Sequence, residues 1–163
     1  METQNKEDKL MKKGRVHFIL LNSYLMFLFT IILGVIFDII TKVRIFSESA
    51  YQYVGLFLIF VGTIVIYWAQ ATSKNYKNKK EEQGDKSHFE FGPYRYLRSP
   101  THFGLLIVTL GFGLLINSLF SIIFTILGYL ISKTVFLRKE ELLLEKKYGE
   151  QYTKYKEKVK NWI

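Results

Sequence analysis

The chain has 163 residues, of which 49% are hydrophobic, and its 23 Lys and Arg residues outnumber 14 Asp and Glu residues. Cysteine is absent, which excludes disulfides, thiolate nucleophiles, thiolate metal sites and lipid attachment to cysteine. The charged residues fall in blocks between apolar runs, and most of the aromatic residues lie inside those runs. The positive charge therefore indicates membrane topology and attraction to anionic lipid, and it argues against nucleic-acid binding.

The first two apolar runs each predict one membrane-spanning helix, over about 18–40 and 50–72. A bilayer core of about 30 Å requires about 20 apolar residues in helical form. Residues 18–37 and 49–73 contain no Lys, Arg, Asp or Glu and fit this length. The first run is too long for a signal-peptide core and no small-residue cleavage pattern follows it, so we expect a membrane anchor.

A third uncharged run, residues 99–132, is too long for one crossing. Asn117-Ser118 near its middle is a pair typical of turns. We therefore predict a helical hairpin over about 101–116 and 119–137, whose second arm carries Lys133 with its amine at the headgroups. The predicted fold is all-α, a single polytopic membrane domain with four transmembrane helices.

The distribution of cations predicts the orientation of these four helices. Five Lys and Arg residues precede the first span, two lie in 41–50, seven in 72–98 and nine from residue 133 onward. Because basic segments remain cytoplasmic, both termini, the 73–100 loop and the 138–163 tail are expected on the cytoplasmic side.

The 73–100 loop changes character along its length. Residues 74–86 are typical of a solvated charged run, whereas the stretch from His88 onward is rich in aromatic residues. Ser99-Pro100 predicts a helix N-cap followed by proline in the first turn. The free N–H groups at such a helix start suit a carboxylate or phosphate.

The 138–163 tail predicts an amphipathic helix that Gly149 breaks or bends. Its apolar stripe recurs mostly every three or four residues, which is also typical of a helix lying on the headgroups: Leu137, Leu144, Tyr148, Tyr152, Tyr155, Val159 and Trp162. Glu140 and Glu141 lie where the last predicted span leaves the membrane, in an otherwise basic region. They therefore either pair with nearby cations or bind a polar ligand.

Two segments resemble the isoprenylcysteine carboxyl methyltransferase superfamily, which includes phospholipid methyltransferase-like members. The family pattern is a histidine, Gly-Pro-Tyr, Arg-His-Pro-x-Tyr-x-Gly, a hairpin, and Glu-Glu-x-x-Leu-x-x-x-Phe-Gly-x-x-Tyr-x-x-Tyr. This chain has His88, then GPYRYLRSPTHFG, and then EELLLEKKYGEQYTKY. The spacing of the last block matches throughout.

The resemblance implies an S-adenosylmethionine-dependent methyltransferase with a lipophilic acceptor, either a lipid amine or a lipophilic carboxylate or thiol. No metal and no nucleic acid is implied. By the same resemblance, Arg98 and His102 are the expected catalytic residues. The residues expected to bind the cofactor are His88, Tyr94, Ser99, Pro100, Thr101, His102 and Glu140. Glu141 is expected to matter less if it faces solvent.

The chain departs from the family pattern at three informative positions. Ser99 replaces a histidine, His102 replaces a tyrosine, and Phe136 stands where prenylcysteine enzymes have an arginine. Phe136 offers neither charge nor hydrogen bond, so we expect an acceptor other than a prenylcysteine carboxylate, with phosphatidylethanolamine the leading candidate. A non-catalytic membrane scaffold that retains the fold is the alternative. A transporter is disfavoured by the few ionisable groups in the spans.

Overall fold

A computed structural model describes residues 2–42, 50–78 and 91–159, with side chains described for 21–42, 50–75 and 91–159 except Lys147. The described part of the chain contains helices and no strand. Its long elements are α1 (Glu2–Thr41), α2 (Ala50–Asn78), α3 (Pro100–Leu115) and α4 (Leu119–Ser132). A π-helical turn, η3 (Lys133–Leu137), leads into α5 (Arg138–Tyr148), and α6 (Glu150–Lys158) follows.

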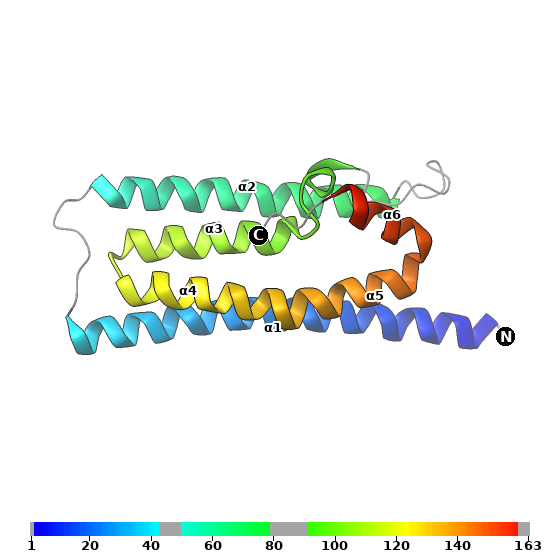
Figure 1. The fold of residues 1–163 in the computed structure, drawn as a ribbon, viewed down its shortest axis with the longest axis horizontal. Helices are drawn as coiled ribbons and strands as arrows, with labels where there is room; N and C mark the ends of the chain where they lie inside the picture. The colour runs from blue at the N-terminus through cyan, green and yellow to red at the C-terminus, as the bar shows by residue number, and fades with distance from the viewer. Residues whose placement is uncertain (1, 43–49, 79–90, 160–163) are drawn as a thin grey trace.

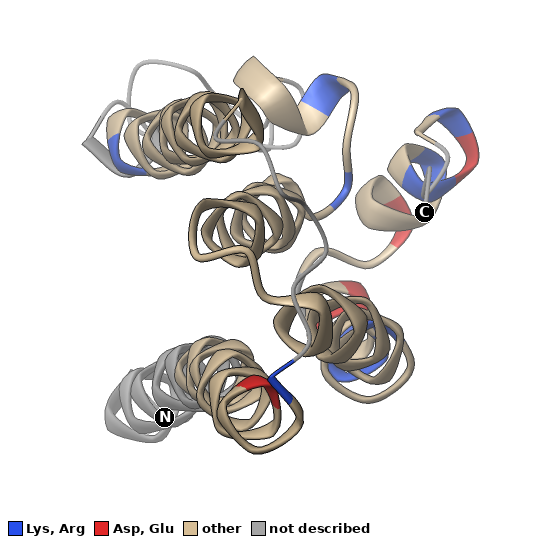
Figure 2. Ribbon diagram, turned by 90° about the vertical axis from the view of Figure 1, so that its left-hand side faces the viewer, with Lys and Arg blue, Asp and Glu red and all other residues tan. Residues whose placement is uncertain are grey.

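The four long helices lie lengthwise beside one another (Figure 1). Seen along the bundle, α2 lies next to α3, and α1 lies next to α4 (Figure 2). Three helical stretches are long and apolar enough to cross a membrane, Leu21–Thr41, Ala50–Asn75 and Leu119–Lys146. Helix α3 is apolar but shorter. At about 1.5 Å per residue its 16 residues extend roughly 24 Å, which is less than a typical hydrocarbon core.

Small residues set the close approach between α2 and α3. A Cβ atom placed on Gly111 would lie 2.6 Å from the Gly55 carbonyl oxygen, and one on Gly62 would lie 2.8 Å from the Gly104 carbonyl oxygen. In lipid, helices associate through such backbone contact because burial of apolar surface gives little gain there.

Helices α1 and α4 are joined by polar contacts at both ends. The Ser23 and Ser132 hydroxyl oxygens lie 3.1 Å apart and are buried. At the other end, Asp38 accepts hydrogen bonds from the Ser118 hydroxyl and from the Phe120 N–H. These contacts fix the register of α1 along α4.

The chain turns at Asn117-Ser118, as predicted. Asn117 has φ +55°, and the Ser118 hydroxyl caps α4 by accepting from the Ser121 N–H at 3.0 Å. Helix α3 begins at Pro100 with Ser99 as its N-cap, also as predicted, although within this described segment the Ser99 side chain makes no capping hydrogen bond.

The apolar runs do not mark where the helices end. Helix α1 extends back through the charged N-terminal segment to Glu2, and helical structure continues from Leu119 to Tyr148 without a break. Gly149, at φ +56°, separates α5 from α6, which confirms the predicted break.

Candidate active site

A short turn precedes α3 and holds its start against α2. The 3-10 helix η2 (Gly92–Arg95) follows extended Phe91 and contains buried Pro93. Gly92 has φ +58°, and a Cβ there would lie 2.3 Å from the Thr72 hydroxyl oxygen on α2. Because only glycine combines this conformation with this contact, Gly92 fixes where Tyr94 and the start of α3 lie.

The centre of the site is a histidine and a glutamate from different helices. His102 on α3 is 3% exposed, and its Nδ1 lies 3.9 Å from Oε2 of Glu140 on α5. In the described part of the chain, neither Nε2 of His102 nor Oε2 of Glu140 has a hydrogen-bond partner, and both atoms are buried. Buried polar atoms ordinarily have partners, so this pair indicates a place for a polar ligand.

Two tyrosines flank Glu140. The Tyr94 and Thr101 hydroxyls share a hydrogen bond, and burial, followed by the nearby charge of Glu140, raises the pKa of Tyr94 to about 12. Tyr94 is therefore a neutral hydroxyl at neutral pH. Tyr24 of α1 interacts electrostatically with Glu140 and is hydrogen-bonded to Gln70 of α2. Helices α1, α2, α3 and α5 and the 3-10 turn η2 thus contribute side chains to one cluster.

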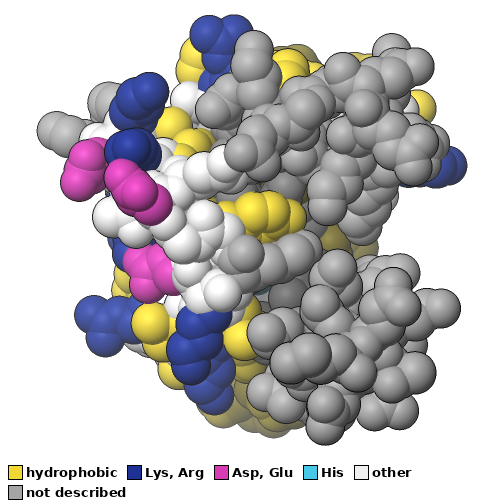
Figure 3. All heavy atoms as spheres, turned by 90° about the vertical axis from the view of Figure 1, so that its right-hand side faces the viewer, with side chains coloured by type: hydrophobic (Ala, Val, Ile, Leu, Met, Phe, Trp, Pro, Cys, Tyr) yellow, Lys and Arg dark blue, Asp and Glu magenta, His cyan; other side chains and the backbone are white. Residues whose placement is uncertain are grey.

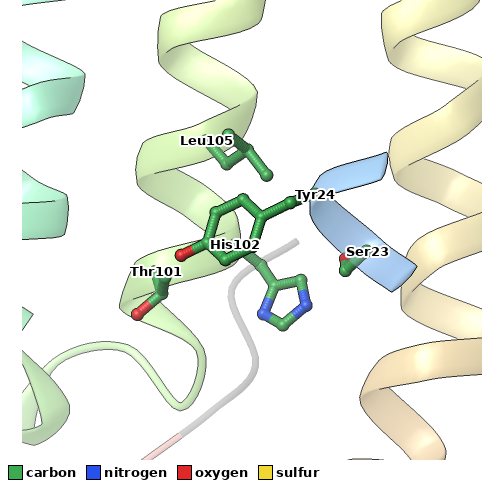
Figure 4. Close-up of a pocket in the computed structure, with 5 residues that line it drawn as sticks. All are labelled: Ser23, Tyr24, Thr101, His102 and Leu105. Atoms are coloured by element: carbon green, nitrogen blue, oxygen red, sulfur yellow. The ribbon is translucent and has the colours of Figure 1, made fainter. Parts of the chain in front are cut away.

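Figure 4 shows a pocket that is lined in part by His102. Ser23 and Tyr24 line it from α1, and Thr101, His102 and Leu105 line it from α3. The Tyr24 side chain reaches from α1 towards α3 (Figure 4). The empty space at this pocket is about 140 Å³, including the part that is open to the surroundings, and it is smaller than the several hundred Å³ usual for a small-molecule site.

Arg98 lies in a different set of contacts, between the loop and the tail. Its Nη1 donates to Glu141 at 2.9 Å, and its Nε donates to the Val159 carbonyl at 2.7 Å. Lys156 of α6 pairs with Glu141 at 3.5 Å and with Glu145 at 2.7 Å. The condition under which Glu141 was expected to matter less does not hold, because Glu141 pairs with Arg98 and does not face solvent.

The described part of the apolar stripe of the tail packs inward, whereas Trp162 lies outside the described residues. Tyr152, Tyr155 and Val159 form a buried cluster, with Leu144 and Tyr148 against it. The Tyr155 hydroxyl donates to the Tyr94 carbonyl at 2.6 Å. Burial raises the pKa of Tyr155, so its hydroxyl remains a donor. Charged side chains gather over this end of the bundle (Figure 3).

The structure brings together part of the predicted cofactor site. Tyr94, Thr101, His102 and Glu140 form the cluster described above, and Ser99 and Pro100 lie at the helix start beside it. His88 lies outside the described residues. The motifs did not point to Tyr24 or Gln70, because each is a polar residue within an apolar run, and only the folded bundle brings these two side chains together and lets Tyr24 interact with Glu140.

Most of the residues in this cluster lie in a segment that matches a known protein family. Residues 50–151 match the family described as phospholipid methyltransferase. The chain belongs to this family. No curated protein and no solved structure matches it. The matched segment begins with α2 and ends in α6, so α1 lies outside it.

The cluster has groups that fit S-adenosylmethionine, the cofactor that methyltransferases generally use. This cofactor presents an ammonium and a carboxylate. Oε2 of Glu140, which has no partner among the described residues, could accept from the ammonium, and the free N–H groups at the start of α3 could donate to the carboxylate. Among the described residues, no three His, Asp or Glu side chains form a group that could hold a metal ion.

Proposed function

We propose that the protein is an integral membrane methyltransferase that uses S-adenosylmethionine to methylate the amine headgroup of a lipid, with phosphatidylethanolamine the leading candidate. One observation carries the proposal. His102 and Glu140 lie beside each other, with Nδ1 and Oε2 3.9 Å apart, and both Nε2 of His102 and Oε2 of Glu140 are buried with no hydrogen-bond partner in the described part of the chain. Membership of the phospholipid methyltransferase family supports the lipid acceptor.

In this proposal, α3 crosses the membrane as a fourth span and the site faces the cytoplasm. The 3-10 turn, the start of α3, α5 and α6 all lie at one end of the bundle (Figure 1). The cationic blocks flank this end in sequence, which supports a cytoplasmic location.

Glu140, Tyr94 and the first turn of α3 would hold the cofactor, which when bound supplies an electrophilic methyl group. Glu140 accepts hydrogen bonds from its ammonium, and the Ser99–Thr101 helix start donates to its carboxylate. The tyrosine hydroxyl and ring line the same space. The enclosing helices exclude water and orient the acceptor for in-line displacement.

His102 would serve as the proton acceptor for an amine. A neutral imidazole has one N–H and one lone pair, and if Nδ1–H faces the Glu140 carboxylate, Nε2 carries the lone pair. Nε2 takes a proton from the ammonium of the acceptor, which leaves a nitrogen lone pair free to form the N–C bond. Arg98 as a catalytic residue stays a prediction, and its contacts with Glu141 and Val159 favour a positioning role.

The test has two stages on purified protein in lipid nanodiscs. Radiolabelled S-adenosylmethionine should bind, and label should pass to phosphatidylethanolamine but not, at comparable rate, to a farnesylcysteine analogue. His102→Gln should retain binding and lose transfer. A protein that binds no cofactor would instead be the non-catalytic scaffold. Rapid methylation of the farnesylcysteine analogue alone would overturn the amine acceptor.

A further inference from the structure

Helix α1 contributes to the site although it lies outside the family match. The matched residues begin at 50, whereas Ser23 and Tyr24 form the α1 wall of the pocket that His102 lines from α3. The buried contact between Ser23 and Ser132, 3.1 Å long, fixes α1 against α4 at this level. Tyr24 is thus held in place by the residue beside it.

Tyr24 of α1 interacts with groups on α2 and α5, near Glu140, whose Oε2 has no hydrogen-bond partner in the described part of the chain. Its side chain is hydrogen-bonded to Gln70 of α2 and interacts electrostatically with Glu140 of α5. It also lies close enough to Tyr94 for the two phenols to interact electrostatically. Tyr24 also lines the same pocket as His102, whose Nδ1 lies 3.9 Å from Oε2 of Glu140. An aromatic ring in a pocket near a carboxylate is a favourable environment for a cation, because the ring face and the carboxylate attract the same charge.

Among the described residues, those that line the pocket include no cation that would attract an anion strongly. Its five lining residues are a serine, a tyrosine, a threonine, a histidine and a leucine, with no Lys or Arg among them. An anionic acceptor in this pocket would lie near Glu140 with no cation among the described lining residues to compensate, and such a placement is unfavourable unless one of the two acids is protonated.

We infer that Tyr24 is a specificity-determining residue of the acceptor pocket, where its ring and hydroxyl favour a cationic amine headgroup over an anionic one. This inference rests on the proposed function, because it assigns the pocket to the acceptor. It adds a residue from α1, which the family-matching segment does not contain.

The test measures headgroup binding without the cofactor, so that its result does not depend on turnover. Short-chain phosphatidylethanolamine and short-chain phosphatidylglycerol are titrated separately into the full-length protein in detergent, with the shift of the unfolding temperature as readout. Tyr24→Phe removes the hydroxyl and Tyr24→Leu removes the ring as well. Tyr129→Phe on α4 is the control, because Tyr129 is a buried tyrosine of the same bundle that does not line the pocket.

We expect Tyr24→Leu to raise the apparent Kd for the phosphatidylethanolamine by about 5-fold while the Kd for the phosphatidylglycerol changes less than 2-fold, with an intermediate effect for Tyr24→Phe. Tyr129→Phe should change neither Kd. Equal losses for both lipids, or no loss, would overturn the inference even if the wild type transfers methyl groups to phosphatidylethanolamine. A wild type that neither binds S-adenosylmethionine nor prefers the amine lipid overturns both the proposed function and this inference.

Discussion

Arg98 and Glu141 form an ion pair, 2.9 Å between Nη1 and Oε1, that joins the start of α3 to α5. Both side chains are mostly buried, at 14% and 16% exposure. The same guanidinium donates through Nε to the Val159 carbonyl at the end of α6. One side chain therefore connects the loop before α3 to both helices of the tail, directly beside the pair formed by His102 and Glu140.

Replacing Arg98 should release α6 from the bundle. Arg98→Lys retains the charge but loses the planar fork that reaches two acceptors at once, which removes about 1–3 kcal/mol from the docked state. Trypsin should then cleave at the exposed Lys154 and Lys158 roughly ten times faster, measured by mass spectrometry of timed digests. Arg95→Lys, an exposed arginine on the same turn, is the control and should leave the cleavage rate unchanged.

Glu140 and Glu141 should behave differently although they are adjacent. Glu140→Gln removes the acceptor charge from the ligand cluster, so the Kd for S-adenosylmethionine should rise about 10-fold or more, with little change in the unfolding temperature. Glu141→Gln should lower the unfolding temperature and expose α6 to trypsin, with a smaller effect on cofactor binding. Equilibrium dialysis and thermal unfolding in detergent measure the two effects. The opposite ranking would assign the ligand to Glu141.

The sequence allowed prediction of the helices and of the motif residues of the site. The turn at Asn117, the helix start at Pro100 and the break at Gly149 each depend on local backbone chemistry, and the structure has all three. The ends of α1 and α4 could not be read from apolar runs, because Lys, Glu and Leu all favour helix and continue it beyond the membrane-like segment.

Contacts between distant helices were not predictable from one sequence. Tyr24 and Gln70 belong to no motif, and both the hydrogen bond between them and the interaction of Tyr24 with Glu140 depend on how the helices lie against one another. The π-helical turn at Lys133–Leu137 was not predictable either. Because such a turn carries an extra residue, the directions of Lys133 and Phe136 around the helix relative to Glu140 do not follow from the spacing of an ideal α-helix.

Gly111 should tolerate a methyl group poorly. A Cβ there would lie 2.6 Å from the Gly55 carbonyl oxygen, which is backbone of α2 and cannot move independently, so Gly111→Ala should destabilise the protein by about 1–3 kcal/mol. Gly113→Ala is the matched control two residues along α3. Its nearest neighbour, at 2.9 Å, is the side-chain atom Cγ1 of Ile122, and the nearest backbone atom lies at 3.4 Å, so a small shift of one side chain relieves most of the contact. Thermal unfolding in detergent should therefore show a larger loss for Gly111→Ala than for Gly113→Ala.

The last prediction concerns the four-span topology. The chain has no cysteine, so single-cysteine variants report on one position each. Thr41 at the end of α1 and Ile116 at the turn after α3 are exposed, and both lie at the end of the bundle away from α6 (Figure 1). Asn75 on α2 and Glu157 on α6 are exposed at the opposite end (Figure 1).

If α3 crosses the membrane, cysteines at Thr41 and Ile116 should react with an impermeant maleimide from one side of sealed vesicles, and those at Asn75 and Glu157 from the other. The cation distribution places the second pair on the cytoplasmic side, since cytoplasmic segments are the basic ones. Labelling of Ile116 from the same side as Glu157 would show that the turn does not reach the opposite surface. The apolar α3, whose 16 residues extend only roughly 24 Å, would then be a re-entrant helix instead of a span.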